Sequence, residues 1–494
     1  MAHIPLIGRL SFKEYIALLV GFSILGIETL LRFTVLLLPK PVVAWFYTRS
    51  QVLFDRFASA QGTQTTEEAF ASAIRSAKDF GELVALYGYA HEEHVVLTKD
   101  GYLLTLHRIP RRKGGHCALL RGRHEETSRV SPPRVAHEQA GYVLDLCVRL
   151  VLTSCAPPVR SAGFDVWLGN NRGNKYSKKS IHHGPSSSKF WNYSLDEFAW
   201  YDIPDSIEYI LARTGAGSLG YVGFSQGTAQ AFACVECQPA VERKSKRSGG
   251  TCACDEPCWI GYPYCGCTHE GVVSQFSRLS HPPPSHCSVS KCGSPTSVYL
   301  FFGRKAILSS VATWQAIIYP PIFTSIIDTA LYFLFSWDSR NITTTQKTAA
   351  YAHLYSYASV KSVVHWFQIM RESTFQMFDD DVAVFGGPAN SGKAYRPARF
   401  PTRNIETPIL LLYGNRDSLM DIEAMVSALP ASGTRAKKLE GYEHLDVLWG
   451  KDIDKDVFPE VVNALRMHCE GPAGAMRNGV KVFEMGADSK EPEE

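Results

Sequence analysis

The sequence has little net charge for its length. Its 494 residues carry 51 Lys and Arg against 48 Asp and Glu, a balance of +3. A protein whose main partner is nucleic acid carries a marked excess of basic residues, because these neutralise the phosphates. The balance therefore argues against a nucleic-acid partner, while the length suffices for a large buried core.

Cysteine is missing from the first hundred residues, and nine of the thirteen cysteines fall between Cys234 and Cys292. A disulfide framework is typical of short secreted domains, which this chain is not. A zinc site is the other interpretation, but the cluster has C-x-C and C-x3-C spacing in place of the repeated C-x2-C of a tetrahedral site. We expect no metal site.

Nucleotide-binding motifs are missing too. Gly215–Gly220 satisfies G-x-G-x-x-G, but it follows an expected helix and precedes an expected strand, the reverse of a dinucleotide fold. Gly169–Lys175 lacks Walker spacing. We therefore expect no cofactor.

An uninterrupted apolar run of bilayer length is also missing. Tyr15–Leu38 is long enough for a span, but Glu28 and Arg32 fall near its middle, where charge is costly in hydrocarbon. The alternatives are a tilted span, an interfacial helix or half-way hairpin ended by the prolines at 39 and 41, a secretory signal peptide, and a buried helix. We expect residues 1–50 to form a membrane-associated hydrophobic anchor.

Strand and helix patterns alternate along much of the remaining chain, which is typical of a mostly parallel α/β sheet. A hairpin is expected at His94–Pro110, with Asp100-Gly101 as a two-residue turn. The other expected elements are strands at 162–168, 221–224, 408–413 and 439–442, and helices at 196–213, restarting at Pro204, and at 226–234.

Gly223-Phe224-Ser225-Gln226-Gly227 matches G-x-S-x-G between an expected strand and an expected helix. In this motif the small residues permit a tight turn that exposes the serine hydroxyl above the sheet. Ser225 is therefore the candidate nucleophile, and the backbone N–H of Gln226 is the candidate oxyanion donor.

A serine nucleophile needs an acid and a histidine. In α/β folds that carry G-x-S-x-G, the acid follows the serine along the chain and the histidine follows the acid. Asp417 comes just past the strand ending at Tyr413, and His444 lies just past the strand expected at 439–442. We expect Asp417 and His444 to complete a triad. The rival acids, Asp379–Asp381, are expected to be a solvated cluster, and the rival bases, His353 and His365, to pack within a helical stretch.

An apolar insertion separates the serine from the aspartate. It includes an uncharged run, Ile307–Ile327, that Pro320-Pro321 interrupts, which argues against a straight spanning helix. In a hydrolase with this order of serine and acid, an insertion between the two lies where a lid would cover the substrate pocket. We expect an apolar lid at 297–378, with an ordinary buried pair of helices as the alternative.

The residues resemble the fungal steryl ester hydrolases and acid lipases of the α/β-hydrolase fold. The resemblance lies in blocks over about three quarters of the chain. Among the matching stretches are HVVLTKDGYLLTLHRIP (94–110), GFDVWLGNNRGNKYS (163–177), YVGFSQGTAQA (221–231), VKSVVHWFQI (360–369) and YEHLDVLWG (442–450).

The resemblance implies a carboxylic ester hydrolase acting on steryl esters and triacylglycerols, with Ser225, Asp417 and His444 as the matching triad positions. Members of the family occur on lipid droplets and cellular membranes. A lipid-droplet, endomembrane or plasma-membrane surface is therefore the expected location. An interfacial anchor suits a droplet, which has one polar face and an oil interior.

Two segments depart from the family pattern. The family carries His-Gly-Leu, whose loop supplies a second oxyanion donor, where this chain has residues 111–160, and an apolar strand where it has 237–296. Our hypothesis is a displaced reading frame or misplaced splice boundary in each, which the nucleotide sequence would test. A catalytically impaired or inactive lipid-binding relative is therefore the alternative function.

The expected organisation follows from these assignments. The α/β-hydrolase core occupies 80–236 and 400–470, separated by the cysteine-rich segment 237–296 and the lid 297–378. A disordered tail at 471–494 ends the chain.

Overall fold

The structure of the protein is a computed structural model. It describes residues 66–110, 133–138, 165–216, 219–237, 259–261, 306–307, 318–354, 356–380 and 397–469, with a few isolated positions before residue 316. The expected anchor at 1–50 lies outside these residues except for positions 23, 41, 42, 45, 48 and 49, as do most of segments 111–160 and 237–296 and the whole tail. Within the described part of the chain, no helix has the length and apolarity needed to cross a membrane.

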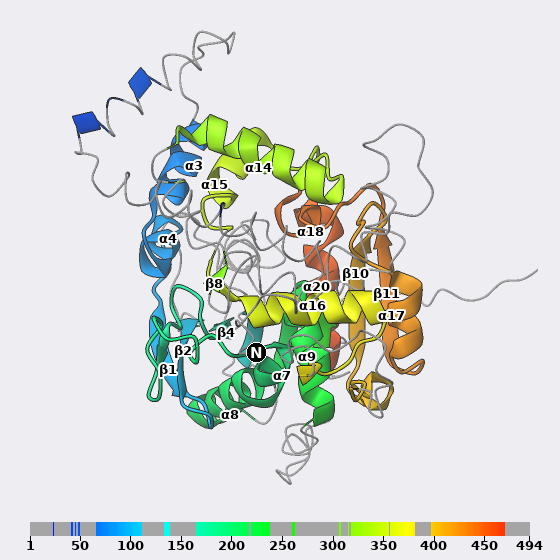
Figure 1. The fold of residues 1–494 in the computed structure, drawn as a ribbon. Helices are drawn as coiled ribbons and strands as arrows, with labels where there is room; N and C mark the ends of the chain where they lie inside the picture. The colour runs from blue at the N-terminus through cyan, green and yellow to red at the C-terminus, as the bar shows by residue number, and fades with distance from the viewer. Residues whose placement is uncertain are drawn as a thin grey trace, which may run out of the picture.

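Among the described residues, a nine-stranded sheet forms the centre of the fold (Figure 1), in the order β1-β2-β4-β3-β6-β7-β10-β11, with β5 beside β2. The pairs β1–β2, β2–β4 and β2–β5 are antiparallel, and the pairs from β4 to β11 are parallel. The expected mostly parallel sheet is confirmed. The strands are β1 (Glu92–Leu97), β2 (Tyr102–Ile109), β3 (Pro133–Glu138), β4 (Asp165–Asn170), β5 (Lys179–Ser180), β6 (Gly220–Gly223), β7 (Trp259–Gly261), β10 (Ile409–Gly414) and β11 (Thr434–Leu439).

Helices cover both faces of this sheet. Along β10, Ile409 and Leu411 enter one hydrophobic cluster, while Leu410 and Leu412 enter the other. Successive strand residues point to opposite faces, so a strand buried on both sides reads as a continuous apolar run. The first cluster includes residues of α8 (Ile203–Thr214), α9 (Gln226–Cys237) and α17 (Ile422–Ala428), and the second includes residues of α3 (Thr66–Ser76), α4 (Phe80–Leu86), α14 (Pro320–Phe335), α15 (Thr344–Ala350), α18 (Asp446–Trp449), α19 (Ile453–Asp456) and α20 (Phe458–Cys469).

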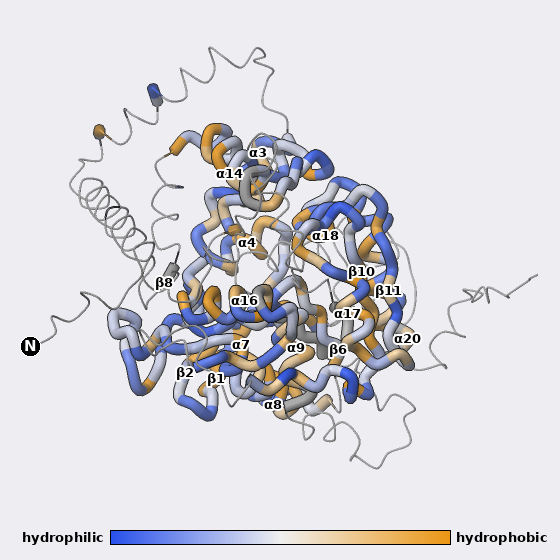
Figure 2. The backbone as a smooth tube through the Cα atoms, turned by 45° about the vertical axis from the view of Figure 1, so that its right-hand side comes forward, coloured by the Kyte–Doolittle hydropathy of each residue, from blue (hydrophilic) through white to orange (hydrophobic). Residues whose placement is uncertain are grey.

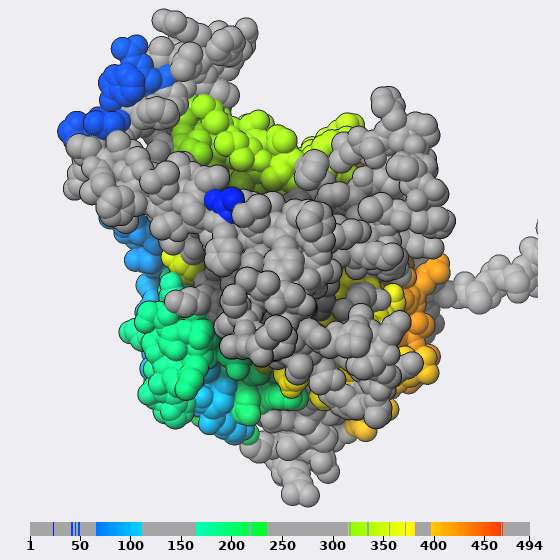
Figure 3. Space-filling model, in the orientation of Figure 1, coloured from blue at the N-terminus to red at the C-terminus, as the bar shows by residue number. Residues whose placement is uncertain are grey.

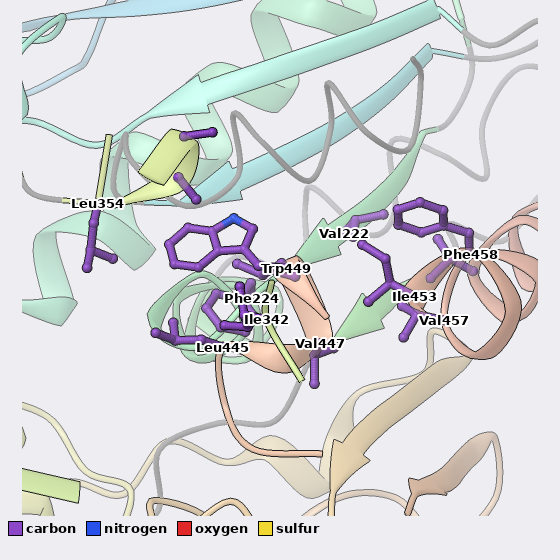
Figure 4. Packing of buried hydrophobic residues seen from close by; sticks show 14 of the residues in the cluster. Val222, Phe224, Ile342, Leu354, Leu445, Val447, Trp449, Ile453, Val457 and Phe458 are labelled. Atoms are coloured by element: carbon purple, nitrogen blue, oxygen red, sulfur yellow. The ribbon is translucent and has the colours of Figure 1, made fainter. Parts of the chain in front are cut away.

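Figure 4 shows the second cluster, which we call the site-side core, from close by. Phe224, Leu445 and Trp449 lie together in it. Phe224 directly precedes the candidate nucleophile, and Leu445 directly follows the candidate base. Hydrophobic packing therefore draws the two loops that carry these residues toward each other.

Several element boundaries differ from expectation. The hairpin is present, but its turn is Thr98–Gly101, closed by the Gly101 N–H donating to Thr98 O at 2.9 Å. Gly101 itself has a φ of +87°, which glycine tolerates. The strand expected at 439–442 is instead β11, Thr434–Leu439, because this edge strand is mostly exposed and its charged side chains obscure the pattern.

The few described residues of the two atypical segments include strands: β3 lies in 111–160 and β7 in 237–296. The sequence of neither segment has a periodic pattern that predicts a strand. Each strand lies between two parallel neighbours and pairs with both of them. This pairing uses backbone N–H and C=O groups, so it does not require a particular pattern of side chains.

The helix expected at 196–213 is built from three pieces. A short α7 (Leu195–Glu197) and a π-helix (Phe198–Asp202) precede α8, which has Pro204 in its first turn. The restart expected at Pro204 is confirmed, since proline at this position loses no helical hydrogen bond.

The loop after β4 is held by Arg172, whose guanidinium is fully buried. Its Nε donates to Asp202 Oδ1 at 2.8 Å and its Nη2 to Asp100 Oδ1 at 2.9 Å, while its face lies 4.1 Å from the ring centroid of Tyr102. These two carboxylates raise the pKa of Arg172 further above its ordinary value, against the opposing effect of burial. The guanidinium of Arg172 and these two carboxylates together join the hairpin, the β4 loop and the π-helix.

The apolar helix α14 begins at the proline pair and lies at the surface along the top of the molecule (Figure 3). Hydrophobic residues are frequent along it (Figure 2), and Ile326 and Tyr332 are exposed. Its one charged residue, Asp328, accepts from Lys347 Nζ and Tyr351 Oη of the α15 region, both at 2.8 Å. The remaining helical elements of the described residues are α16 (Val360–Glu372) and a 3-10 turn at Thr402–Asn404. A separate two-stranded pair is formed by β8 (Ala306–Ile307) and β9 (Ala358–Ser359).

Candidate active site

Ser225 lies in the turn between β6 and α9 and has a φ of +52°. Left-handed backbone is strained for a residue with a side chain, and such strain persists only where the surroundings enforce it. Gly223 is required beside it, because a Cβ there would lie 2.7 Å from Thr228 N. The turn is closed by the Gly227 N–H donating to Phe224 O at 2.8 Å. The tight turn expected for G-x-S-x-G is therefore present, and its backbone is strained at Ser225.

Gln226 is the first residue of α9, so its backbone N–H belongs to the first turn of the helix, where the N–H groups have no carbonyl partner within the helix. Its side-chain Oε1 accepts from Trp366 Nε1 of α16 at 3.0 Å. This hydrogen bond ties the nucleophile turn to the segment between the serine and the aspartate.

His444 and Asp417 are in direct contact: His444 Nδ1 donates to Asp417 Oδ2 at 2.7 Å, and both side chains are buried. An ionised carboxylate only accepts, so the proton of neutral His444 resides on Nδ1 and Nε2 carries the lone pair. Asp417 Oδ1 also accepts from the Leu419 N–H at 2.9 Å, which fixes the carboxylate. The imidazole is thus held in the tautomer of a general base.

The two loops that carry these residues follow neighbouring parallel strands, β10 and β11. The Arg416 N–H donates to Tyr442 O at 3.0 Å, and the Gly441 N–H donates to Asn415 Oδ1 at 2.7 Å. A Cβ at Gly414 would lie 2.1 Å from Tyr442 O, so only glycine permits this approach. Strand order therefore brings Asp417 and His444 together.

Two aromatic rings contact the imidazole of His444. Phe224 lies 4.8 Å away between ring centroids at 44°, and Trp337 stacks at 5.3 Å and 13°. Because Phe224 is adjacent to Ser225 in the chain, its contact places His444 against the nucleophile turn. The structure thus brings all three expected triad residues to one region, at the carboxyl ends of β6, β10 and β11.

Residues beside the triad that the sequence did not single out anchor the histidine loop. The Glu443 carboxylate accepts from the backbone N–H groups of Asp338 at 3.0 Å and Ser339 at 2.8 Å. Asp446 Oδ2 accepts from Asn341 Nδ2 and from the Glu443 N–H, both at 2.8 Å. Burial raises the pKa of Asp446 to about 6, partly offset by these hydrogen bonds. Only their adjacency to His444 in the sequence could have indicated them.

The rival residues have other roles. His365 Nδ1 accepts from the Leu195 N–H at 3.3 Å and its Nε2 donates to Gln376 O at 2.8 Å, and burial lowers its pKa to about 4. His353 Nε2 pairs with Ile74 O at 2.9 Å and lies between α15 and α16 rather than within a helix. Asp379 is buried and its N–H donates to Gln368 Oε1, so the expected solvated cluster is wrong for this residue.

Metal-ligating groups of three or more His, Cys, Asp or Glu side chains are absent from the described residues. The cysteines from 252 to 292 lie outside those residues, and the described Cys234 is buried.

Two family models match the chain: the partial α/β-hydrolase lipase region over residues 80–135 and the α/β hydrolase fold over residues 150–238. A probable lipase of Schizosaccharomyces pombe is 37% identical over 467 residues, covering 94% of this chain and 96% of the relative. The chain belongs to the acid lipase family of α/β hydrolases. As a lipase of this family it is a carboxylic ester hydrolase for lipid esters.

More distant acid lipases also match over most of their length. The gastric triacylglycerol lipase of Rattus norvegicus is 26% identical over 400 residues, covering 78% of this chain and 91% of the relative. Among solved structures, a soluble variant of monoglyceride lipase from Saccharomyces cerevisiae superposes with a TM-score of 0.43 at 13% identity, covering 78% of this chain and 99% of that one.

Proposed function

We propose that the protein hydrolyses steryl esters and triacylglycerols through a Ser225–His444–Asp417 triad. The observation that carries the proposal is the buried 2.7 Å hydrogen bond from His444 Nδ1 to Asp417, with His444 held against the ring beside Ser225. Triacylglycerol is the substrate in the name of the gastric relatives. Steryl esters are included among the proposed substrates because blocks of the sequence resemble the fungal steryl ester hydrolases.

The reaction follows from these positions. Nε2 of His444 takes the proton of Ser225 as Oγ attacks the ester carbonyl, and Asp417 stabilises the imidazolium that forms. The N–H of Gln226 donates to the tetrahedral oxyanion. The imidazolium then protonates the leaving alcohol, a sterol or diacylglycerol, and water releases the fatty acid by the same steps.

The surface helix α14 is proposed to belong to a lid. Its outward face carries Ile326 and Tyr332, its one acidic side chain is paired with the α15 region, and its end reaches His444 through Trp337. Such a helix suits a substrate that lies in a lipid phase. The anchor at 1–50 and a membrane or lipid-droplet location remain part of the same proposal.

The test is hydrolysis of cholesteryl oleate and triolein emulsions by the purified full chain, beside Ser225→Ala. We expect fatty-acid release from both lipids by the wild type and none above background by the variant, with unchanged thermal unfolding. A fluorophosphonate probe should label wild-type Ser225 and leave the variant and heat-denatured wild type unlabelled. Undiminished turnover in the variant would contradict the triad, and an unlabelled wild type would favour the inactive lipid-binding relative.

The lid is tested with a short-chain ester measured on either side of its solubility limit. We expect the rate per enzyme to rise when droplets form, since α14 would then contact a lipid surface. A rate that follows only the dissolved ester would argue for an ordinary buried helix pair.

A further inference from the structure

The indole of Trp337 lies against the imidazole of His444, and its position is closely determined. The two rings are nearly parallel, at 13°, with centroids 5.3 Å apart, and Trp337 is 4% exposed. Its Nε1–H donates to Ser418 Oγ at 3.1 Å, and the Ser418 hydroxyl donates to Phe335 O at 2.7 Å. Ser418 directly follows Asp417, so the indole contacts the base and is bonded to the loop of the acid.

The backbone around Trp337 is strained on both sides. Ser336 has a φ of +56° and Ser339 a φ of +51°, and no glycine occupies either position. Ser225 and Ser373 are the other non-glycine residues with positive φ in the described part of the chain. Ser336 is the C-cap of α14, and strain of this kind persists when neighbouring contacts enforce it. Here the contacts are those of Asp338 and Ser339 with the carboxylate of Glu443, next to His444.

The hydrogen bond to Asp417 holds the imidazole only at Nδ1. Rotation about that bond would still change the direction of Nε2, and the packed rings of Phe224 and Trp337 oppose it. An aromatic face also attracts a cation within about 6 Å. The imidazolium that forms as His444 takes the proton of Ser225 is such a cation, so the attraction stabilises the transition state of that step.

We propose that Trp337 is a positioning residue for His444: its indole face, held by the strained connection after α14, orients the imidazole and stabilises the imidazolium. The proposal rests on the triad assignment and adds a contribution from the inserted segment to the chemistry itself. A displacement of the end of α14 would therefore also move the ring against His444, because hydrogen bonds join Trp337 to Ser418 and Ser418 to Phe335.

The experiment compares Trp337→Leu and Trp337→Phe in the full chain on a dissolved short-chain ester, which removes any effect of a lipid surface. Active sites are counted by fluorophosphonate titration, so that kcat refers to folded enzyme. Trp337→Leu should lower kcat on the order of tenfold with KM changed less than twofold, because the lost attraction acts on the transition state. Trp337→Phe keeps an aromatic face and should recover most of this loss.

Trp167→Leu is the matched control. Trp167 is equally buried, in β4, and contacts His94 and Tyr209 rather than the candidate site. We expect Trp167→Leu to lower the unfolding midpoint while kcat per titrated site stays within twofold. If Trp337→Leu yields no folded enzyme, Trp337→Met takes its place under the same criteria.

Three results would overturn the inference: an unchanged kcat in Trp337→Leu, an equal loss in Trp337→Phe, or an equal loss in the control. Failure of the triad itself is distinguishable, since it would appear as retained turnover in Ser225→Ala.

Discussion

Replacing Asp417 by Asn removes one charge from the buried pair without changing its shape. Oδ1 of the native carboxylate accepts from the Leu419 N–H at 2.9 Å, and Oδ2 accepts from His444 Nδ1 at 2.7 Å. In Asp417→Asn the amide oxygen remains with the Leu419 N–H, so the amide NH2 faces Nδ1. Nδ1 must then accept, which moves the imidazole proton to Nε2. In that tautomer His444 has no lone pair for the proton of Ser225.

The expected loss in kcat is about 10³- to 10⁴-fold. A carboxylate about 4 Å from the imidazolium charge contributes about 4 kcal/mol at an effective dielectric constant of about 20. Each 1.36 kcal/mol is a factor of ten in rate, so this attraction alone accounts for about 10³. The inverted tautomer accounts for the rest, and the same change in a serine protease costs about 10⁴.

The assay is kcat on a dissolved ester, with Asp421→Asn as the matched control. Asp421 is on the same loop and caps α17 through Ala424 N at 2.9 Å, a task that Asn performs equally well. The control should therefore keep wild-type kcat. If Asp417→Asn retained more than a tenth of the wild-type kcat at equal stability, the reasoning would be refuted, and Glu443 or Asp446 would become the candidate acid.

Two further predictions concern stability. Arg172→Met leaves Asp202 buried without its partner and should cost about 3–5 kcal/mol in the free energy of unfolding, measured with urea; a cost below about 1 kcal/mol would contradict a structural role for the pair. Burial lowers the pKa of His107 to about 3, against about 6.5 when unfolded, and both ring nitrogens lack a hydrogen bond among the described residues. Between these values the unfolded chain binds a proton that the folded protein does not, so stability falls as pH drops below about 6.5. His107→Leu should therefore stabilise the protein by about 2 kcal/mol more at pH 5 than at pH 8, and equal effects at both pH values would exclude a buried neutral histidine.

The elements that the sequence predicted best are those whose pattern is local. The turn at Ser225 requires small residues within five positions, and β10 is an apolar run because both of its faces are buried. By contrast, β11 has the burial pattern of an exposed edge, and its alternation cannot be seen in Thr-Arg-Ala-Lys-Lys-Leu. Neither β3 nor β7 has a clear periodic signal, and each is defined by the strands on either side.

The same distinction holds within the candidate site. The proximity of Asp417 and His444 was predictable because each follows a strand of the sheet in the expected order. Trp337 and Glu443 were not, since their partners lie 81 to 107 residues away along the chain and only the folded sheet brings them together.

The placement of β7 between β6 and β10 has a consequence for folding. Neighbouring strands lie about 4.8 Å apart, so β6 and β10 are separated by about 10 Å, and three residues, Trp259–Gly261, bridge them. Ser225 follows β6 on one side of β7, and Asp417 and His444 follow β10 and β11 on the other side. Under the proposed triad, esterase activity therefore requires β7 to be paired with both β6 and β10. Activity should vanish as soon as β10 and β11 detach from the sheet, while the hairpin half of the sheet is still folded.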